Sequence, residues 1–236
     1  LEYVQDAHAV LRLYKLEGKA LAIGELPGQG SVTGFPGTPD DPETFLAYTD
    51  FSTPRTVLKL DTVTGTVSPV AAGKPPIAAD RFVTRQVFYT SRDGTRVPMH
   101  IVHRKDLVLD GQQPTVLYGY GGFNVSLMPT YSAARMAWIE AGGVYAQANL
   151  RGGGEYGEAW HLAGTKLNKQ NVFDDFSAAA EWLIANGVTS PAQLAIWGGA
   201  GFYLTSVVAG RSATAGMDQL AADGTARSFD LPTVSV

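Results

Sequence analysis

The chain has 236 residues and no cysteine, which allows one large or two small domains and excludes a disulfide framework or a thiolate metal site. Hydrophobic residues make up 45% of it, enough for a packed core, while a charged content of 17% and a net charge of −4 argue against a nucleic-acid-binding protein. No apolar run approaches the ~18 residues of a membrane span. We also expect no signal peptide, although the true N-terminus could lie before Leu1.

Residues 1–70 are predicted to form short strands and turns. Two hairpin patterns resemble each other, because Tyr14-Lys15-Leu16-Glu17 matches Leu58-Lys59-Leu60-Asp61, 44 residues later. A repeat of about this length is typical of β-propeller blades. We therefore expect residues 1–70 to be one to two blades of a partial propeller. The proline-rich stretch 71–80 that follows is predicted to be a linker.

Residues 81–200 change character, because strand patterns there alternate with helical ones. The expected strands are 82–91 and 97–104, joined at Asp93-Gly94, and then 115–120, 144–150 and 194–198. The expected helices are 130–141 and 173–186, the second capped by Asn171 and ended by Gly187. Such alternation predicts a mainly parallel α/β sheet of about five strands. Residues 201–236 form an atypical tail in which no further sheet strand is predicted.

The chain is organised around the stretch Gln193–Phe202. Its short apolar run, two glycines and helix-like continuation provide the context of a nucleophile elbow, Gly-x-Ser-x-Gly. Gly198 occupies the first glycine position of that motif, but Ala200 stands where the serine belongs and Phe202 where the second glycine belongs. The sequence thus predicts the scaffold of a nucleophile without the nucleophile.

Several motifs, in order, resemble the prolyl oligopeptidase family of S9-type serine peptidases over residues 1–199 or so. They are Tyr118-Gly119-Tyr120-Gly121-Gly122-Phe123-Asn124, Ala148-Asn149-Leu150-Arg151-Gly152-Gly153-Gly154-Glu155-Tyr156-Gly157, Trp160-His161, Asn168-Lys169-Gln170-Asn171 and Phe173-Asp174-Asp175-Phe176. Two earlier motifs, 30–35 and 50–54, resemble the end of the family's propeller. The resemblance implies an incomplete α/β-hydrolase sheet, with strand order 1-2-4-3-5, preceded by a propeller fragment.

The resemblance also implies roles for four positions. Tyr120 matches a tyrosine whose hydroxyl stabilises the oxyanion, and Phe123 matches an aromatic residue of the proline pocket. Ala200 is the position of the missing nucleophile, and the backbone N–H of Gly201 could serve as a second oxyanion donor. Without the resemblance, Tyr120 and Phe123 are more simply explained as core aromatic residues after a strand.

No other group completes a catalytic triad in the sequence. Ser206 and Ser212 lack the Gly-x-Ser-x-Gly frame, and no histidine follows His161, whose expected role is structural. The family's Asp and His follow later strands than the five found here. We therefore expect a serine-type endopeptidase that cleaves short peptides after proline, inactive as this chain, with a non-catalytic peptide-binding pseudoenzyme or a truncated fragment as the alternative.

The remaining expectations concern ligands and location. We expect short proline-containing peptides as partners, and neither nucleic acid, membrane, cofactor nor metal. Strand 194–198 would lack its next neighbour in the sheet, which favours self-association through the exposed edge. The expected compartment is the cytoplasm, with the periplasm left open.

Overall fold

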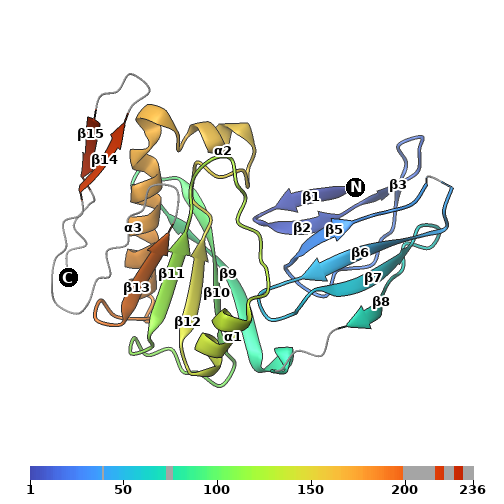
Figure 1. Cartoon of the computed structure of the whole chain (residues 1–236), viewed down its shortest axis with the longest axis horizontal. Coiled ribbons are helices and arrows are strands. Elements are labelled where there is room, and N and C mark those ends of the chain that lie inside the picture. The colour runs from blue at the N-terminus through green and yellow to red at the C-terminus, as the bar shows by residue number, and fades with distance from the viewer. Residues whose placement is uncertain (39, 73–76, 199–215, 221–225, 231–236) are drawn as a thin grey trace. The chain divides into compact units, whose positions relative to one another are not determined.

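The computed structural model describes residues 1–38, 40–72, 77–198, 216–220 and 226–230 (Figure 1). Two compact units make up the chain: Leu1–Phe82 with Met128–Ala137, and Val83–Leu127 with Trp138–Val236. Each unit has a hydrophobic cluster of its own.

The first unit consists of antiparallel β-structure. Its strands are β1 (Glu2–Gln5), β2 (His8–Leu11), β3 (Leu13–Tyr14), β4 (Ala20–Leu21), β5 (Ser31–Gly34), β6 (Glu43–Thr49), β7 (Thr56–Asp61) and β8 (Val67–Ala72). Strands β5, β6, β7 and β8 form one four-stranded sheet in chain order, each antiparallel to the next. A four-stranded antiparallel meander is the architecture of one propeller blade, so the expected propeller fragment is present.

Alternation of side chains explains why these residues form a half-buried sheet. Leu46 and Tyr48 of β6 face the same core as Leu58 and Leu60 of β7, at a spacing of two residues. The turn after β6 is built by Asp50, whose carboxylate accepts hydrogen bonds from the backbone N–H groups of the following residues.

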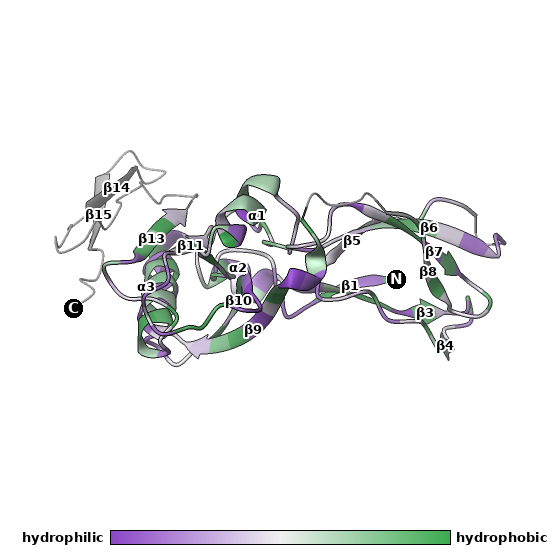
Figure 2. Cartoon of the chain, turned by 90° about the horizontal axis from the view of Figure 1, so that it is seen from below, coloured by the Kyte–Doolittle hydropathy of each residue, from purple (hydrophilic) through white to green (hydrophobic). Residues whose placement is uncertain are grey.

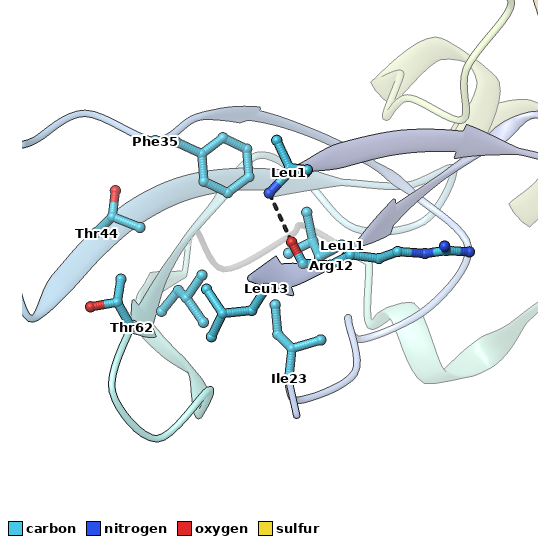
Figure 3. Close-up of a pocket in the computed structure, with 9 residues that line it drawn as sticks. Leu1, Leu11, Arg12, Leu13, Ile23, Phe35, Thr44 and Thr62 are labelled. Carbon is cyan, nitrogen blue, oxygen red and sulfur yellow. Dashed lines mark hydrogen bonds between the residues drawn. The ribbon is translucent and has the colours of Figure 1, made fainter. Parts of the chain in front are cut away.

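The first unit also contains a hollow of about 320 Å³ (Figure 3). Apolar side chains from several strands line it, including Leu11, Leu13, Ile23 and Phe35. Close by, the amino group of Leu1 donates a hydrogen bond of 2.8 Å to the carbonyl oxygen of Arg12. Because the lining is mainly aliphatic, this hollow offers no set of groups for acid–base or nucleophilic chemistry.

The second unit is an α/β structure. Its elements are β9 (Phe82–Thr90), β10 (Arg96–Arg104), β11 (Thr115–Gly119), β12 (Val144–Ala148), α2 (Glu158–Leu162), η2 (Lys166–Asn168), α3 (Gln170–Ala185) and β13 (Leu194–Gly198). Helix α1 (Ala133–Glu140) is divided between the two units, and strand β9 begins at the last residue of the first.

Five strands of this unit form one mixed sheet in the order β13-β11-β12-β10-β9. This order is the 1-2-4-3-5 arrangement expected from the family resemblance, counted from β9. Strands β13, β11 and β12 run parallel, whereas β10 pairs with β12 in the antiparallel sense. The sheet is therefore mixed, and its parallel part is confined to the three strands that carry the candidate site.

Helix α3 packs its apolar face against this sheet. Val172, Phe176, Ala179 and Leu183 share one hydrophobic cluster with strand residues such as Leu117, and Figure 2 shows hydrophobic colouring in α3 and the neighbouring strands. Their helical spacing of three or four residues explains why one face is buried.

One local expectation is wrong, and the structure adds detail to the stretches expected to be a linker and a tail. Helix α3 begins at Gln170, so Asn171 lies inside it and donates a hydrogen bond of 2.8 Å to the carbonyl oxygen of Ala163 instead of capping the helix. Strand β8 extends into the stretch expected to be a linker, where η1 (Ala79–Arg81) also forms. The tail contains a hairpin of β14 (Gly216–Leu220) and β15 (Ala226–Asp230), outside the five-stranded sheet.

Candidate active site

Three parallel strands bring distant parts of the sequence to one edge of the sheet. In the register of β11, Gly119 pairs with Ala148 of β12 on one side and with Gly198 of β13 on the other. All three strands therefore end at the same level, as Figure 1 shows. Ligand sites of open α/β sheets lie outside the carboxyl ends of the strands, so this edge is the candidate site.

Tyr120 and Phe123 follow directly after β11 at this edge. Tyr120 is half-buried, whereas the side chain of Phe123 is 79% exposed. Phe123 has φ of 54°, in the left-handed region that a residue with a Cβ rarely adopts. Because its side chain is exposed, Phe123 is not the core aromatic residue that the sequence without the family resemblance favours. Ala200 and Gly201 lie outside the described residues.

A glycine-rich loop, residues 152–154, packs against the backbone that carries Tyr120 and Phe123. A Cβ on Gly152 would lie 2.6 Å from the carbonyl oxygen of Gly121, and one on Gly154 would lie 2.7 Å from that of Asn124. Both distances are too short for any side chain. Glycine is required in this loop because two backbone segments are in direct contact here. A phosphate-binding role is not needed to explain the glycines.

Helix α2 holds the glycine loop from its other side. The ring nitrogen Nδ1 of His161 lies 2.8 Å from the carbonyl oxygen of Gly152 and must donate, because a carbonyl oxygen only accepts. The indole N–H of Trp160 donates to the carbonyl oxygen of Leu150 at 3.1 Å. His161 is therefore engaged in a backbone hydrogen bond.

A buried ion cluster anchors the end of β12 to α3 and to the β9–β10 turn. The guanidinium of Arg151, 4% exposed as a residue, donates to Asp175 on α3 and to Asp93 in the turn. The hydrogen bond from Arg151 lowers the pKa of Asp93 to about 2. Burial by itself would lower the pKa of Arg151, but the hydrogen bonds to the two carboxylates outweigh it and raise that pKa.

Two further buried ionisable groups lie at this edge, and sequence reasoning assigned neither of them a role. Lys169, 8% exposed, donates from Nζ to the carbonyl oxygen of Gly121 at 2.7 Å. Glu155, 4% exposed, accepts the backbone N–H of Leu127 at 2.9 Å. Burial lowers the pKa of Lys169 to about 8 and raises the pKa of Glu155. Both residues stand in the motifs that carry the family resemblance, but nothing local in the sequence signals burial.

Tyr120 follows β11, and the neighbouring strand β13 leads toward residue 200, so both segments begin at the same edge of the sheet. Among the described residues, no group of three or more His, Cys, Asp or Glu side chains could hold a metal ion. In the same part of the chain, none of the helices combines the length and apolarity needed to cross a membrane.

A sheet of the propeller-blade type, followed along the chain by a five-stranded part of an α/β-hydrolase sheet, defines the fold class. Comparison with known proteins agrees. Residues 1–72 match the model of the prolyl oligopeptidase N-terminal β-propeller domain, and residues 129–215 match the model of the prolyl oligopeptidase family. The chain belongs to the prolyl oligopeptidase family.

Several members of the family are similar to most of this chain. Prolyl endopeptidase from Elizabethkingia meningoseptica is 44% identical over 196 residues, which are 83% of this chain and 28% of that protein. Prolyl oligopeptidase ophP from Omphalotus olearius is 40% identical over 90% of this chain and 29% of its own length. The chain therefore spans less than a third of these relatives.

Solved structures of the family give the same picture. One, from a study of two prolyl endopeptidases, has 48% sequence identity and a TM-score of 0.79, and the match covers 85% of this chain and 30% of that one. Prolyl oligopeptidase B from Galerina marginata, bound to a 35-residue hydrolysis and macrocyclisation substrate, has 34% identity and a TM-score of 0.77, with 84% and 28% covered. The similarity confirms the expected fold class.

Proposed function

We propose that this chain carries the oxyanion side of the active site of a prolyl endopeptidase-type serine peptidase that acts on short peptides. The carrying observation is the parallel register of Gly119 with Gly198, which places the strand before Tyr120 beside the strand that leads to Ala200. In this assignment the Tyr120 hydroxyl donates to the oxyanion, the Gly201 N–H is a second donor, and the exposed ring of Phe123 contacts the substrate proline.

The sequence at the nucleophile position argues that this chain does not catalyse the reaction by itself. Acyl transfer of this kind needs a nucleophile, a base within about 3 Å and an acid that orients the base. Ala200 offers a methyl group instead of a hydroxyl, and no histidine follows His161. A serine at position 200 would stay a poor nucleophile without a base.

A purified-protein assay with a chromogenic proline substrate and a serine-directed phosphonate probe tests this proposal. We expect no hydrolysis and no covalent labelling, either for the unmodified chain or for Ala200→Ser. Labelling of the unmodified chain that maps to Ser206 or Ser212 would reveal a different nucleophile and refute the assignment.

The absent nucleophile also favours a second candidate, a non-catalytic protein or truncated fragment that still contacts peptides. Calorimetry with a proline-containing peptide separates the two. Because Tyr120 and Phe123 supply one side of a pocket, we expect very weak binding. Micromolar affinity that is lost in Phe123→Ala would instead support the peptide-binding pseudoenzyme.

Two expectations about the state of the chain remain proposals. We infer self-association through β13, which is an edge strand of the described sheet and carries the 54% exposed Trp197. Light scattering over a concentration series tests it, and a monomer at every concentration would contradict it. The cytoplasm is the proposed compartment, on the family resemblance alone, and cell fractionation tests it.

A further inference from the structure

The segment that carries the candidate site is held in an unfavourable backbone conformation. The site loop, residues 120–127, has φ of 59° at Gly121, 54° at Phe123 and 57° at Asn124. For a residue with a Cβ, the left-handed region is unfavourable, because the Cβ comes too close to the following carbonyl oxygen. Two such residues in succession require outside contacts that hold the loop in place.

One of these contacts comes from Lys169, at the junction of η2 and α3, 48 residues further along the chain. Its ammonium reaches the carbonyl oxygen of Gly121, the residue that follows Tyr120. Within the described part of the chain, this hydrogen bond is the only polar contact of the Lys169 side chain, and no carboxylate pairs with it. Burying a lysine without a paired carboxylate costs free energy. The charge-assisted hydrogen bond to the Gly121 carbonyl offsets part of this cost.

The other end of the site loop is held by a separate group. Glu155 Oε1 accepts the backbone N–H of Leu127, and Asn149 donates both to this oxygen, at 3.1 Å, and to the carbonyl oxygen of Leu127, at 2.8 Å. These contacts fix the end that lies away from Tyr120. Between these ends, the backbone N–H of Asn124 donates to the carbonyl oxygen of Gly152, and Lys169 is the side chain that bonds the Gly121 carbonyl, next to Tyr120.

We propose that Lys169 is a positioning residue, whose hydrogen bond to the Gly121 carbonyl sets the orientation of Tyr120 and Phe123 at the substrate-binding edge. The inference rests on the proposed function for the meaning of those two residues, but the geometry of the loop can be measured without any substrate. Lys169 acts through the loop and does not itself contact a reacting group.

The pKa of Lys169 makes the contact testable in the unmodified protein. Burial alone lowers this pKa to about 8, and no charged group contributes to the shift. Glu155 is the ionisable group that holds the site loop at its other end, and burial raises its pKa. Loss of the ammonium charge weakens the hydrogen bond, since charge-assisted bonds are roughly twice as strong as neutral ones.

The experiment uses the full chain labelled with 4-fluorophenylalanine and observed by fluorine NMR. The chain has 10 phenylalanines, and the resonance of Phe123 is assigned with Phe123→Leu. Lys169→Met removes the donor and keeps the length of the side chain. Lys166→Met removes an exposed lysine from the same segment and is the matched control.

We expect Lys169→Met to move or split the Phe123 resonance by more than its linewidth. The resonances of the buried Phe51 and Phe173 should stay in place, and Lys166→Met should change none of the three. In the unmodified chain, the Phe123 resonance should move with a midpoint near pH 8, and this titration should vanish in Lys169→Met. The proposal would be overturned if the chemical shift of the Phe123 resonance changed neither in Lys169→Met nor with pH.

A second variant guards against a loss of folding. The chain has no cysteine, so Lys169→Cys can be alkylated during unfolding with an aminoethyl reagent, which rebuilds a lysine-like amine at this position only. Return of the Phe123 resonance to its original position supports positioning, and failure to return in a refolded protein contradicts it. Adding a proline peptide separates the two proposals, because a Phe123 resonance that responds to Lys169 but to no peptide refutes only the proposed function.

Discussion

Replacing Arg151 by methionine should destabilise the second unit strongly. Asp175 is fully buried and receives three hydrogen bonds from the Arg151 side chain, the shortest of 2.6 Å. Among the hydrogen bonds within the described part of the chain, Asp175 would keep in Arg151→Met only the one from the backbone N–H of residue 151, at 3.0 Å. Breaking a buried pair by removing one partner costs about 3–5 kcal/mol, a large part of the 5–15 kcal/mol that holds a domain folded.

Urea unfolding followed by tryptophan fluorescence measures this effect selectively. All 4 tryptophans lie in the second unit, so the signal reports mainly on that unit. Arg85→Met, an exposed arginine on β9, is the matched control and should stay within about 0.5 kcal/mol of the unmodified chain.

The double variant Arg151→Met, Asp175→Asn identifies the cause. If the cost arises from an unpaired buried charge, removing that charge should recover part of the stability, so the double variant should be more stable than Arg151→Met. A loss below about 1 kcal/mol for Arg151→Met, in the range of exposed pairs, would refute the reasoning. So would a double variant in which the two losses simply add.

Two other predictions concern acid and the glycine loop. Because Arg151 lowers the pKa of Asp93 from 3.8 to about 2, the stabilisation by Asp93 is present above about pH 4 and is lost as the pH falls toward 2. The side chain of Asp93 is 46% exposed, so the effect on the free energy of unfolding is about 1 kcal/mol or less. In urea unfolding, Asp93→Asn should be less stable than the unmodified chain at neutral pH and equally stable near pH 2. A stability difference that does not change with pH would contradict this prediction. Gly94→Ala should lower the free energy of unfolding by about 1 kcal/mol, because Gly94 has φ of 87° but nothing within 4 Å of an added Cβ. Gly152→Ala should lower it by more than about 3 kcal/mol, because at φ of 90° the added Cβ also meets the backbone of Gly121. Equal losses for the two variants would argue against the close backbone contact.

The sequence by itself determined the types of the elements and the family. The apolar run 194–197 predicts a buried strand, and the helical spacing from Phe173 to Leu183 predicts an amphipathic helix. Both elements form, but β13 is an edge strand of the described sheet with Ala195 and Trp197 exposed, so the expected burial is wrong. Asp93-Gly94 predicts the turn between β9 and β10. These signals are local, because the periodicity of a strand or a helix can be detected within a few successive residues.

Only the tertiary structure decided which groups meet. The pairing of Gly119 with Gly198 depends on how the crossovers pack on the sheet, and no local pattern encodes that register. The same is true of Asn171, which suits a helix cap but donates to the carbonyl oxygen of Ala163, the residue that ends α2. In the sequence, Lys169 has the pattern of an exposed lysine. It is buried because the fold places it against Gly121, which lies 48 positions earlier in the chain.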